Sequence, residues 1–412
     1  MLSGLGIQGR NTLSMRTMLV VASWSLAIAG TAGAAASGRP DSTSASPSAE
    51  APAYPAAVIV STPADFPRGR ISGYMFGDLY YNMAGDPRHL YDTKGVDQGQ
   101  VNIDGKKNIG KDLNGAQLRR GYFQLDNDLT PHFSTRFRLE VDGKELTSGG
   151  KLGVFVKNAY LLSKSVLPRM DVYFGEITTP SFENSEAFWQ YRSVEKTIVD
   201  FLGLRPSSDL GIEIKGFADP DHHFGYAAMM GDGPGQKPET DRFKTWYLSL
   251  PARFGDLRVE PAVDYQVVRV NPNLTAVSDT TVNNDQATYK LFAGYEFRRC
   301  ALGVEAFSRL NHGGAKPNAE LRGISVFGRG SIRPTLGAFA RFDQFQNDVN
   351  KPNRVDFQLW IAGLDWQPVK DIHIMPNVEA TQYLRQGTAV VPSHHDLQAR
   401  ITFYYLFSRP QS

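Results

Sequence analysis

The alternation of apolar and polar residues along the last two-thirds of the chain predicts β-strands. From Leu397 to Phe407, one face of the expected strand carries Leu, Ala, Ile, Phe, Tyr and Phe, and the other carries Gln, Arg, Thr, Tyr and Leu. A period of two residues places successive side chains on opposite faces of a strand. When most of a chain repeats this pattern, with polar residues on one side and aromatic residues near strand ends, it is typical of an outer-membrane β-barrel. Such barrels are most often pores, so the pattern indicates transport.

We expect an all-β fold, a transmembrane antiparallel β-barrel of about 16 strands. The predicted strands are 71–82, 115–127, 132–142, 153–164, 170–177, 208–218, 223–231, 242–251, 257–269, 286–297, 300–310, 320–331, 333–344, 354–366, 372–384 and 394–407. Short connections rich in turn formers, such as 219–221 and 253–256, alternate with long ones at about 83–114, 178–207 and 270–285. Short periplasmic turns and long external loops produce this alternation, and an even strand number places both barrel ends in the periplasm.

The same alternation predicts which side chains line the lumen. Phe137 and Ile212 are expected to face lipid, whereas Arg138, Glu140 and Glu213 are expected to point inward. A charged Arg or Lys at the lipid midplane costs about 2–4 kcal/mol, so charged residues within the strands mark the wet side. In a barrel of this size the wet side is the channel.

The N-terminus predicts export from the cytoplasm. Arg10 and Arg16 precede an apolar run from Met18 to Ala29, which is followed by small residues that suit cleavage, so residues 1–36 are expected to be a signal peptide. Residues 37–70 are rich in Ala, Ser and Pro and are expected to form a disordered periplasmic segment, with the barrel over 71–412. No later stretch approaches the roughly 18–20 apolar residues of a spanning helix. These features together predict the bacterial outer membrane as the location.

Composition excludes several other functions. The formal net charge of +2 and the lack of a basic cluster argue against nucleic-acid binding. Cys300 is the one cysteine, so neither a disulfide framework nor a thiolate metal cage can form. The histidine pairs at 222–223 and 394–395 fall at turns or loops, and neighbours in a strand point to opposite faces. We therefore expect no metal, no cofactor and no enzymatic activity.

Three stretches resemble the phosphate-selective porin O and P family. They are LRRGYFQLD at 118–126 with LTPHF at 129–133, VYFGEITTPSFE at 172–183, and YRS at 191–193 followed by DLGI at 209–212. The resemblance runs from about Gly73 to the last strand. It implies a 16-stranded porin whose third external loop, here 178–207, folds into the barrel, and it implies phosphate as a solute.

The chain also departs from this family's pattern. Family members often carry lysine where this chain has Thr178, and arginine where it has Ser208. Anion pores are built from rings of Arg or Lys, but the inward candidates here are a near-balanced mixture of acidic and basic residues. The balance predicts a less selective channel.

The third external loop is the expected constriction, because many large apolar residues alternate in it with charges. We expect its Glu183, Arg192, Glu195 and Lys196 to lie near the narrowest point of the pore, opposite a basic wall of three strand arginines. The full set of predicted pore-lining residues is Arg120, Arg136, Arg138, Glu140, Lys157, Glu183, Arg192, Glu195, Lys196, Glu213 and Lys215. Opposed charges across a narrow gap would filter polar solutes. The alternative is that the aromatic residues pack on the rim and the charges are solvated.

The predicted function is passive diffusion of small hydrophilic solutes and ions, anions including phosphate among them. Two alternatives stay open, an outer-membrane barrel enzyme or adhesin and a soluble β-rich periplasmic binding protein. Expected partners are outer-membrane lipid, two further copies in a homotrimer, and the barrel-assembly machinery. The last strand carries outward aromatic residues at Phe403, Tyr405 and Phe407, and we expect it to act as the assembly signal.

Overall fold

The computed structural model describes residues 65–87, 102–103, 106–107, 109–271, 280–314, 317–389 and 395–410. The predicted signal peptide at 1–36 lies outside the described residues, and so does most of the predicted disordered segment. The first strand begins at Arg68, so the last three residues of that segment belong to the barrel.

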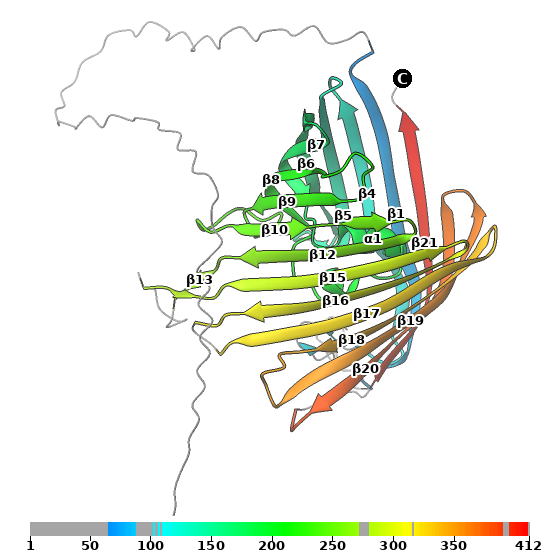
Figure 1. Ribbon diagram of the computed structural model, residues 1–412. Coiled ribbons are helices and arrows are strands. Elements are labelled where there is room, and N and C mark those ends of the chain that lie inside the picture. The colour runs from blue at the N-terminus through cyan, green and yellow to red at the C-terminus, as the bar shows by residue number, and fades with distance from the viewer. Residues whose placement is uncertain are drawn as a thin grey trace, which may run out of the picture. The chain divides into compact units, whose positions relative to one another are not determined.

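Antiparallel strands form one closed sheet (Figure 1). The barrel strands are β1 Arg68–Ala84, β4 Asn114–Asp128, β5 Phe133–Leu146, β6 Leu152–Leu167, β7 Met170–Thr178, β8 Ser208–Phe217, β9 Gly225–Gly231, β10 Thr245–Ser249, β11 Ala252–Phe254, β12 Leu257–Gln266, β15 Gln286–Phe297, β16 Cys300–Asn311, β17 Ala319–Arg333, β18 Leu336–Gln346, β19 Arg354–Val369, β20 Ile372–Gln386 and β21 His395–Pro410. Two small hairpins, β2 Asn102–Ile103 with β3 Lys106–Lys107 and β13 Arg269–Val270 with β14 Val282–Asn283, lie outside this sheet. β1 pairs with both β4 and β21, which closes the barrel.

The sheet has seventeen strands at sixteen barrel positions. β10 and β11 both pair with β12 and are separated by Leu250 and Pro251, so they are two pieces of one barrel strand. Proline has no backbone N–H to donate to a ladder, and this explains the break. The predicted 16-stranded antiparallel barrel is confirmed.

Several predicted boundaries differ from the structure by three or four residues. The strand expected at 333–344, for example, begins at Leu336, because Pro334 lies in the turn after β17. The other predicted strands agree with the structure to within a few residues at each end.

The predicted assignment of faces is confirmed along the strands. On β8, Ile212 is 40% exposed on the outside, whereas its neighbour Glu213 is 2% exposed inside. On β15, Leu291 is exposed and Lys290 is buried. The outer surface is therefore apolar and the enclosed surface carries the charges, as a barrel in lipid requires. In the described part of the chain, no helix has the length and apolar character to cross a membrane.

Two bulges interrupt the alternation on the inner wall. Between β1 and β4, Phe76 pairs with Arg120 and Gly77 with Leu118, so Arg119 is an extra residue. Between β5 and β6, the pairing skips Lys157 in the same way. A bulge lets two consecutive side chains point to the same side of a sheet. Each of these bulges therefore adds one basic residue to the lumen.

The face assignment can be tested at two adjacent positions of β8. Ile212→Arg places a charge on the apolar outer surface, where lipid contact makes it unfavourable by about 2–4 kcal/mol. Its matched control, Glu213→Gln, keeps the shape of an inward side chain. We expect a reduced heat-modifiable, folded fraction on gels for Ile212→Arg and a near-normal one for Glu213→Gln. Equal folded fractions would contradict the assignment.

Candidate pore constriction

The connection from β7 to β8, residues 179–207, carries two short helices, α1 Glu183–Trp189 and α2 Ile198–Phe201. Its large apolar side chains are almost completely removed from solvent. They are Phe182, Phe188, Trp189, Val194, Ile198, Val199 and Leu204. A loop lying freely in water would not bury this set, so the loop must pack against another surface.

That surface is the inner wall of β15–β20. The ring of Phe188 lies 5.4 Å from that of Phe292 on β15, and the ring of Trp189 lies 5.3 Å from that of Phe327 on β17. Tyr191 packs on Phe339 of β18 at 4.2 Å. The loop therefore lies inside the barrel, as the prediction required, and α1 contacts β16 and β17 (Figure 1). The alternative in which these aromatic residues pack on the rim is wrong.

Arginines from well-separated strands hold the loop by its backbone. Arg329 on β17 donates to the carbonyl of Phe188 at 3.1 Å, and Arg341 on β18 donates to the carbonyl of Lys196. Arg119 on β4 donates to the carbonyls of Ser193 and Val194. Because β4 is several strands away from β17 and β18 in both directions around the barrel, the loop crosses the lumen between them.

The charged residues of the loop are paired, mostly with one another. Arg192 contacts Glu186 at 2.9 Å and Asp200 at 3.2 Å, and Lys196 contacts Asp200 at 2.7 Å. Burial alone would raise the pKa of Asp200, but Lys196 and Arg192 hold that pKa well below its usual range. Acidic residues of the loop therefore neutralise Arg192 and Lys196, both of which were predicted to face a basic wall.

Glu195 joins the loop to the opposite wall through the bulge residue. Its carboxylate lies 3.0 Å from the guanidinium of Arg119, which also lies 3.6 Å from Asp78. Burial opposes ionisation, yet Arg119 and more distant arginines lower the pKa of Glu195 to about 2. Glu195 was predicted to face Arg120, Arg136 and Arg138, but its partner is Arg119.

The strand arginines that were predicted to form a basic wall are also largely neutralised. Arg120 pairs with Glu140 and with Asp142, the latter at 3.0 Å, and Lys157 lies 3.4 Å from Glu140.

Arg136 and Arg138 lie further toward the periplasmic end of the barrel. Arg136 pairs with Asp126 at 2.6 Å, whereas Arg138 donates to the amide oxygen of Gln124 at 2.6 Å. Within the described ranges Arg138 forms no ion pair, so it is the strand cation with uncompensated charge in this group.

The loop and the wall meet at Tyr122 of β4. Its hydroxyl lies 3.4 Å from Nη1 of Arg192, and it is paired in register with Glu140 of β5. The structure thus gathers one part of the predicted set around the narrow region and leaves the rest below it. The gathered residues are Arg120, Glu140, Lys157, Arg192, Glu195 and Lys196.

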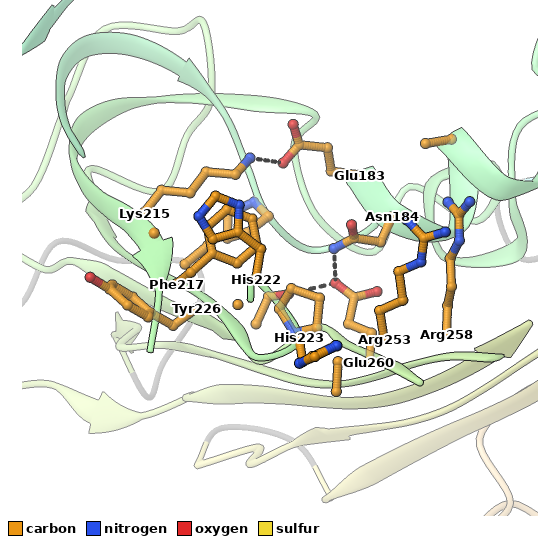
Figure 2. Close-up of a pocket in the computed structure, with 18 of the residues that line it drawn as sticks. Glu183, Asn184, Lys215, Phe217, His222, His223, Tyr226, Arg253, Arg258 and Glu260 are labelled. Carbon is orange, nitrogen blue, oxygen red and sulfur yellow. Dashed lines mark hydrogen bonds and ion pairs between the residues drawn. The ribbon is translucent and has the colours of Figure 1, made fainter. Parts of the chain in front are cut away.

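Glu183 and Lys215 lie on the periplasmic side of the loop. They line a cavity of about 680 Å³ between α1 and strands β7–β12, and their charged groups are 2.5 Å apart (Figure 2). In the same view, Asn184 of α1 donates to Glu260 of β12 at 2.8 Å. Glu213 is buried close to this pair and does not line the cavity. Glu183 and Lys215 therefore lie apart from the contact of the loop with Tyr122.

Sequence reasoning missed three residues of the site. Arg119 was not among the predicted pore-lining residues, because no sequence signal distinguishes a bulge from a regular strand there. Asp200 and Glu186 neutralise Arg192, but they come from two different short helices of the loop. Their proximity depends on how the loop folds back, which periodicity does not report.

One group of potential metal ligands occurs in the described part of the chain. Oxygens of Asp219 and Asp221 and a ring nitrogen of His223 lie within 4.8 Å of one another in the turn from β8 to β9. The Asp219 carboxylate already accepts hydrogen bonds from the backbone N–H groups of His223 and Phe224, at 2.9 and 2.7 Å. These bonds close the turn, so we assign the group a structural role.

Comparison with solved structures establishes the type of fold. The outer membrane channel DcaP of Acinetobacter baumannii superposes with a TM-score of 0.60 at 13% identity, covering 84% of this chain and 99% of that one. An anion-selective porin from Comamonas acidovorans gives 0.56 at 11% identity, covering 83% and 100%. OmpT of Vibrio cholerae gives 0.54 at 14% identity, covering 84% and 99%. No family model and no curated protein sequence matches the chain. The fold is therefore that of a porin, and the resemblance to phosphate-selective porins stays a prediction.

The apolar contact between loop and wall can be tested at Trp189. Trp189→Ala should weaken the attachment of the loop, because truncating a buried aromatic side chain costs about 3–5 kcal/mol. We expect larger open-channel current fluctuations in planar bilayers, since the loop would sample more positions. Trp189→Phe, which keeps a ring against Phe327, is the matched control. Unchanged noise in Trp189→Ala would show that this contact does not hold the loop.

Proposed function

We propose that the protein is a bacterial outer-membrane porin that lets small hydrophilic solutes and ions diffuse passively. The observation that carries this proposal is a closed barrel with an apolar outside and a charged lumen, crossed by a loop held from separate strands. Two of the similar structures are an outer membrane channel and an anion-selective porin, and this likeness supports the proposal by analogy.

Selectivity is expected to be weak, because charges of opposite sign lie side by side around the narrow region. Glu140 forms ion pairs with both Arg120 and Lys157, and Asp200 forms ion pairs with both Arg192 and Lys196. A solute at the distance of a Debye length, about 8 Å at physiological salt, is exposed to little net field from such pairs. Filtering is then governed mainly by size and by local hydrogen bonding.

Phosphate is proposed as one permeant anion and not as a selected ligand. At the two positions where phosphate-selective porins often carry lysine and arginine, the hydroxyls of Thr178 and Ser208 each accept a hydrogen bond of 3.3 Å from Asn158. Asn158 is buried, so this cluster closes the wall at that point. A barrel enzyme or adhesin is the second candidate, and no specific arrangement among the described residues favours it.

The balance of charges around the narrow region can be tested with two substitutions that should shift the reversal potential in opposite directions. Glu140→Gln leaves Arg120 and Lys157 without their shared carboxylate, so the reversal potential under a salt gradient should move toward anion preference. Arg138→Gln removes the uncompensated cation and should move it toward cation preference. Lys244→Gln is the control, because Lys244 pairs with Asp232 and Glu239 in the connection between β9 and β10, away from the narrow region.

The two shifts must have opposite signs for the assignment to hold. If Glu140→Gln and Arg138→Gln shift the reversal potential in the same direction, ions do not permeate past these two residues. A shift in Lys244→Gln as large as either of the others would mean that general surface charge sets the preference.

We further propose that three copies associate in the membrane, with lipid around the assembly and the barrel-assembly machinery acting during insertion. One solved form of the structurally similar OmpT of Vibrio cholerae is a trimer. Amine-reactive cross-linking in native outer membranes should give a band at three times the mass of the monomer, which heating before cross-linking abolishes. A single monomer band under both conditions would refute the trimer.

A further inference from the structure

Five inward-facing tyrosines form a belt on the inner wall, partly exposed except for Tyr122. The belt consists of Tyr404 on β21, Tyr74 on β1, Tyr122 on β4, Tyr160 on β6 and Tyr173 on β7. These strands are consecutive around the barrel, with only β5 contributing no tyrosine between them. Tyr122 contacts Arg192 of the loop and Tyr404 packs against the apolar cluster that holds the loop, whereas Tyr160 and Tyr173 have no such role among the described contacts.

Ring contacts connect the belt. Tyr74 lies 5.8 Å from Tyr404 and 4.4 Å from Tyr122, and Tyr160 lies 5.4 Å from Tyr173. On β5, the strand without a tyrosine, Arg138 lies over Tyr122 and Arg136 lies over Tyr160, each 5.7 Å from the ring centroid. The tyrosine rings and the two guanidinium groups therefore form a row of flat surfaces that continues from one strand to the next.

The belt descends from the constriction toward the periplasm. Tyr122 contacts Arg192 of the loop and is in register with Glu140, whereas Tyr160 is in register with Arg136, four residues nearer the periplasmic end of β5. Tyr160 lines a cavity of about 430 Å³ beside β1 and β4–β6, and Tyr173 lines the cavity of about 680 Å³. A solute that has passed the loop meets these two rings next.

Two of the ion pairs beside the belt lie next to its tyrosines, and further charged residues such as Arg70 and Arg258 line the same two cavities. Asp126 with Arg136 lies beside Tyr160, and Glu183 with Lys215 lies in the cavity that Tyr173 lines. Each pair offers donors and acceptors with little net charge. Such groups match hydroxyls, which donate and accept, better than they match an ion, which would need an unpaired partner.

We propose that the tyrosine belt binds neutral ring-shaped polyols, that is sugars, as they leave the constriction. The apolar C–H face of a sugar ring packs on the electron-rich face of an aromatic side chain, and its hydroxyls bond to the neighbouring ion pairs. Ligand sites typically have volumes of about 300–1,000 Å³, and the volumes of both cavities fall in that range. This inference rests on the proposed porin function and adds a solute class to it.

The test uses the full-length protein in planar bilayers with maltotriose as the probe. Maltotriose should reduce the ion current of the native protein in a saturable way, whereas sorbitol, a polyol without a ring, should not. Tyr160→Leu and Tyr173→Leu should each raise the half-saturating maltotriose concentration by roughly tenfold, through loss of one stacking surface. Tyr160→Phe and Tyr173→Phe should stay within about twofold, because the ring remains and neither hydroxyl has a protein partner among the described residues.

Tyr289→Leu is the matched control, because Tyr289 is 52% exposed on the outer surface. Its half-saturating concentration should equal that of the native protein.

Several results would overturn the inference. A conducting channel that maltotriose does not block would refute sugar binding while leaving the porin function intact. Block by the neutral aromatic compound nicotinamide but not by maltotriose would show that the belt binds aromatic rings instead of sugars. Tighter block by glucuronic acid than by maltotriose would show that Arg138 selects an anion.

Calorimetric titration of maltotriose into detergent-solubilised protein gives a second reading that does not depend on conductance. Binding that is weakened in the Leu variants supports the belt even if the bilayer currents fail. No binding to folded protein refutes it, and folded protein without conductance refutes the porin function separately.

Discussion

The structure depends on the packing of the β7–β8 loop against one inner wall. A barrel of sixteen strands encloses more space than its own side chains fill, and an unobstructed lumen would be a wide water-filled channel. Here the inner faces of β15–β20 carry a cluster of apolar side chains, among them Phe292, Phe327 and Phe339, which would be unfavourable against water. The loop covers them with Phe188 and Trp189. The hydrophobic effect thus places the loop, and the rest of the lumen adapts to that placement.

The strands on the other side of the loop supply the remaining polar surface of the lumen. β1 and β4–β7 contribute the ion pairs around Arg120, the two bulges and the tyrosine belt. The bulges place Arg119 and Lys157 beside residues that already point inward, so basic groups reach both the loop backbone and Ser207 at the end of the loop. The apolar cluster on β15–β20 anchors one side of the loop, and the charged and tyrosine side chains of β1 and β4–β7 border the passage on its other side.

Electrostatics explains why so many charges are compatible with so little net field. An ionised group inside the barrel is stable only with a partner, and the structure supplies one for most of them. Arg341 with Asp343 and Lys290 with Glu260 are buried almost completely near the loop attachment. The pairs around Arg192 and Arg120 are partly exposed to the lumen. The buried pairs serve the architecture, and the partly exposed pairs present donors and acceptors to passing solutes.

The sequence by itself determined the barrel, its strand number and the direction of most side chains. Period-two alternation follows from local backbone geometry, so Ile212 outside and Glu213 inside could be inferred without neighbours. The apolar residues of 178–207, together with the family resemblance, also predicted an inward loop. What only the tertiary structure decided is which charges meet. Arg119 points inward because of a pairing offset between two strands, and Glu195 reaches it from the far side of the lumen. Neither strand pairing offsets nor loop paths follow from periodicity, because both are set by contacts between segments far apart in the chain.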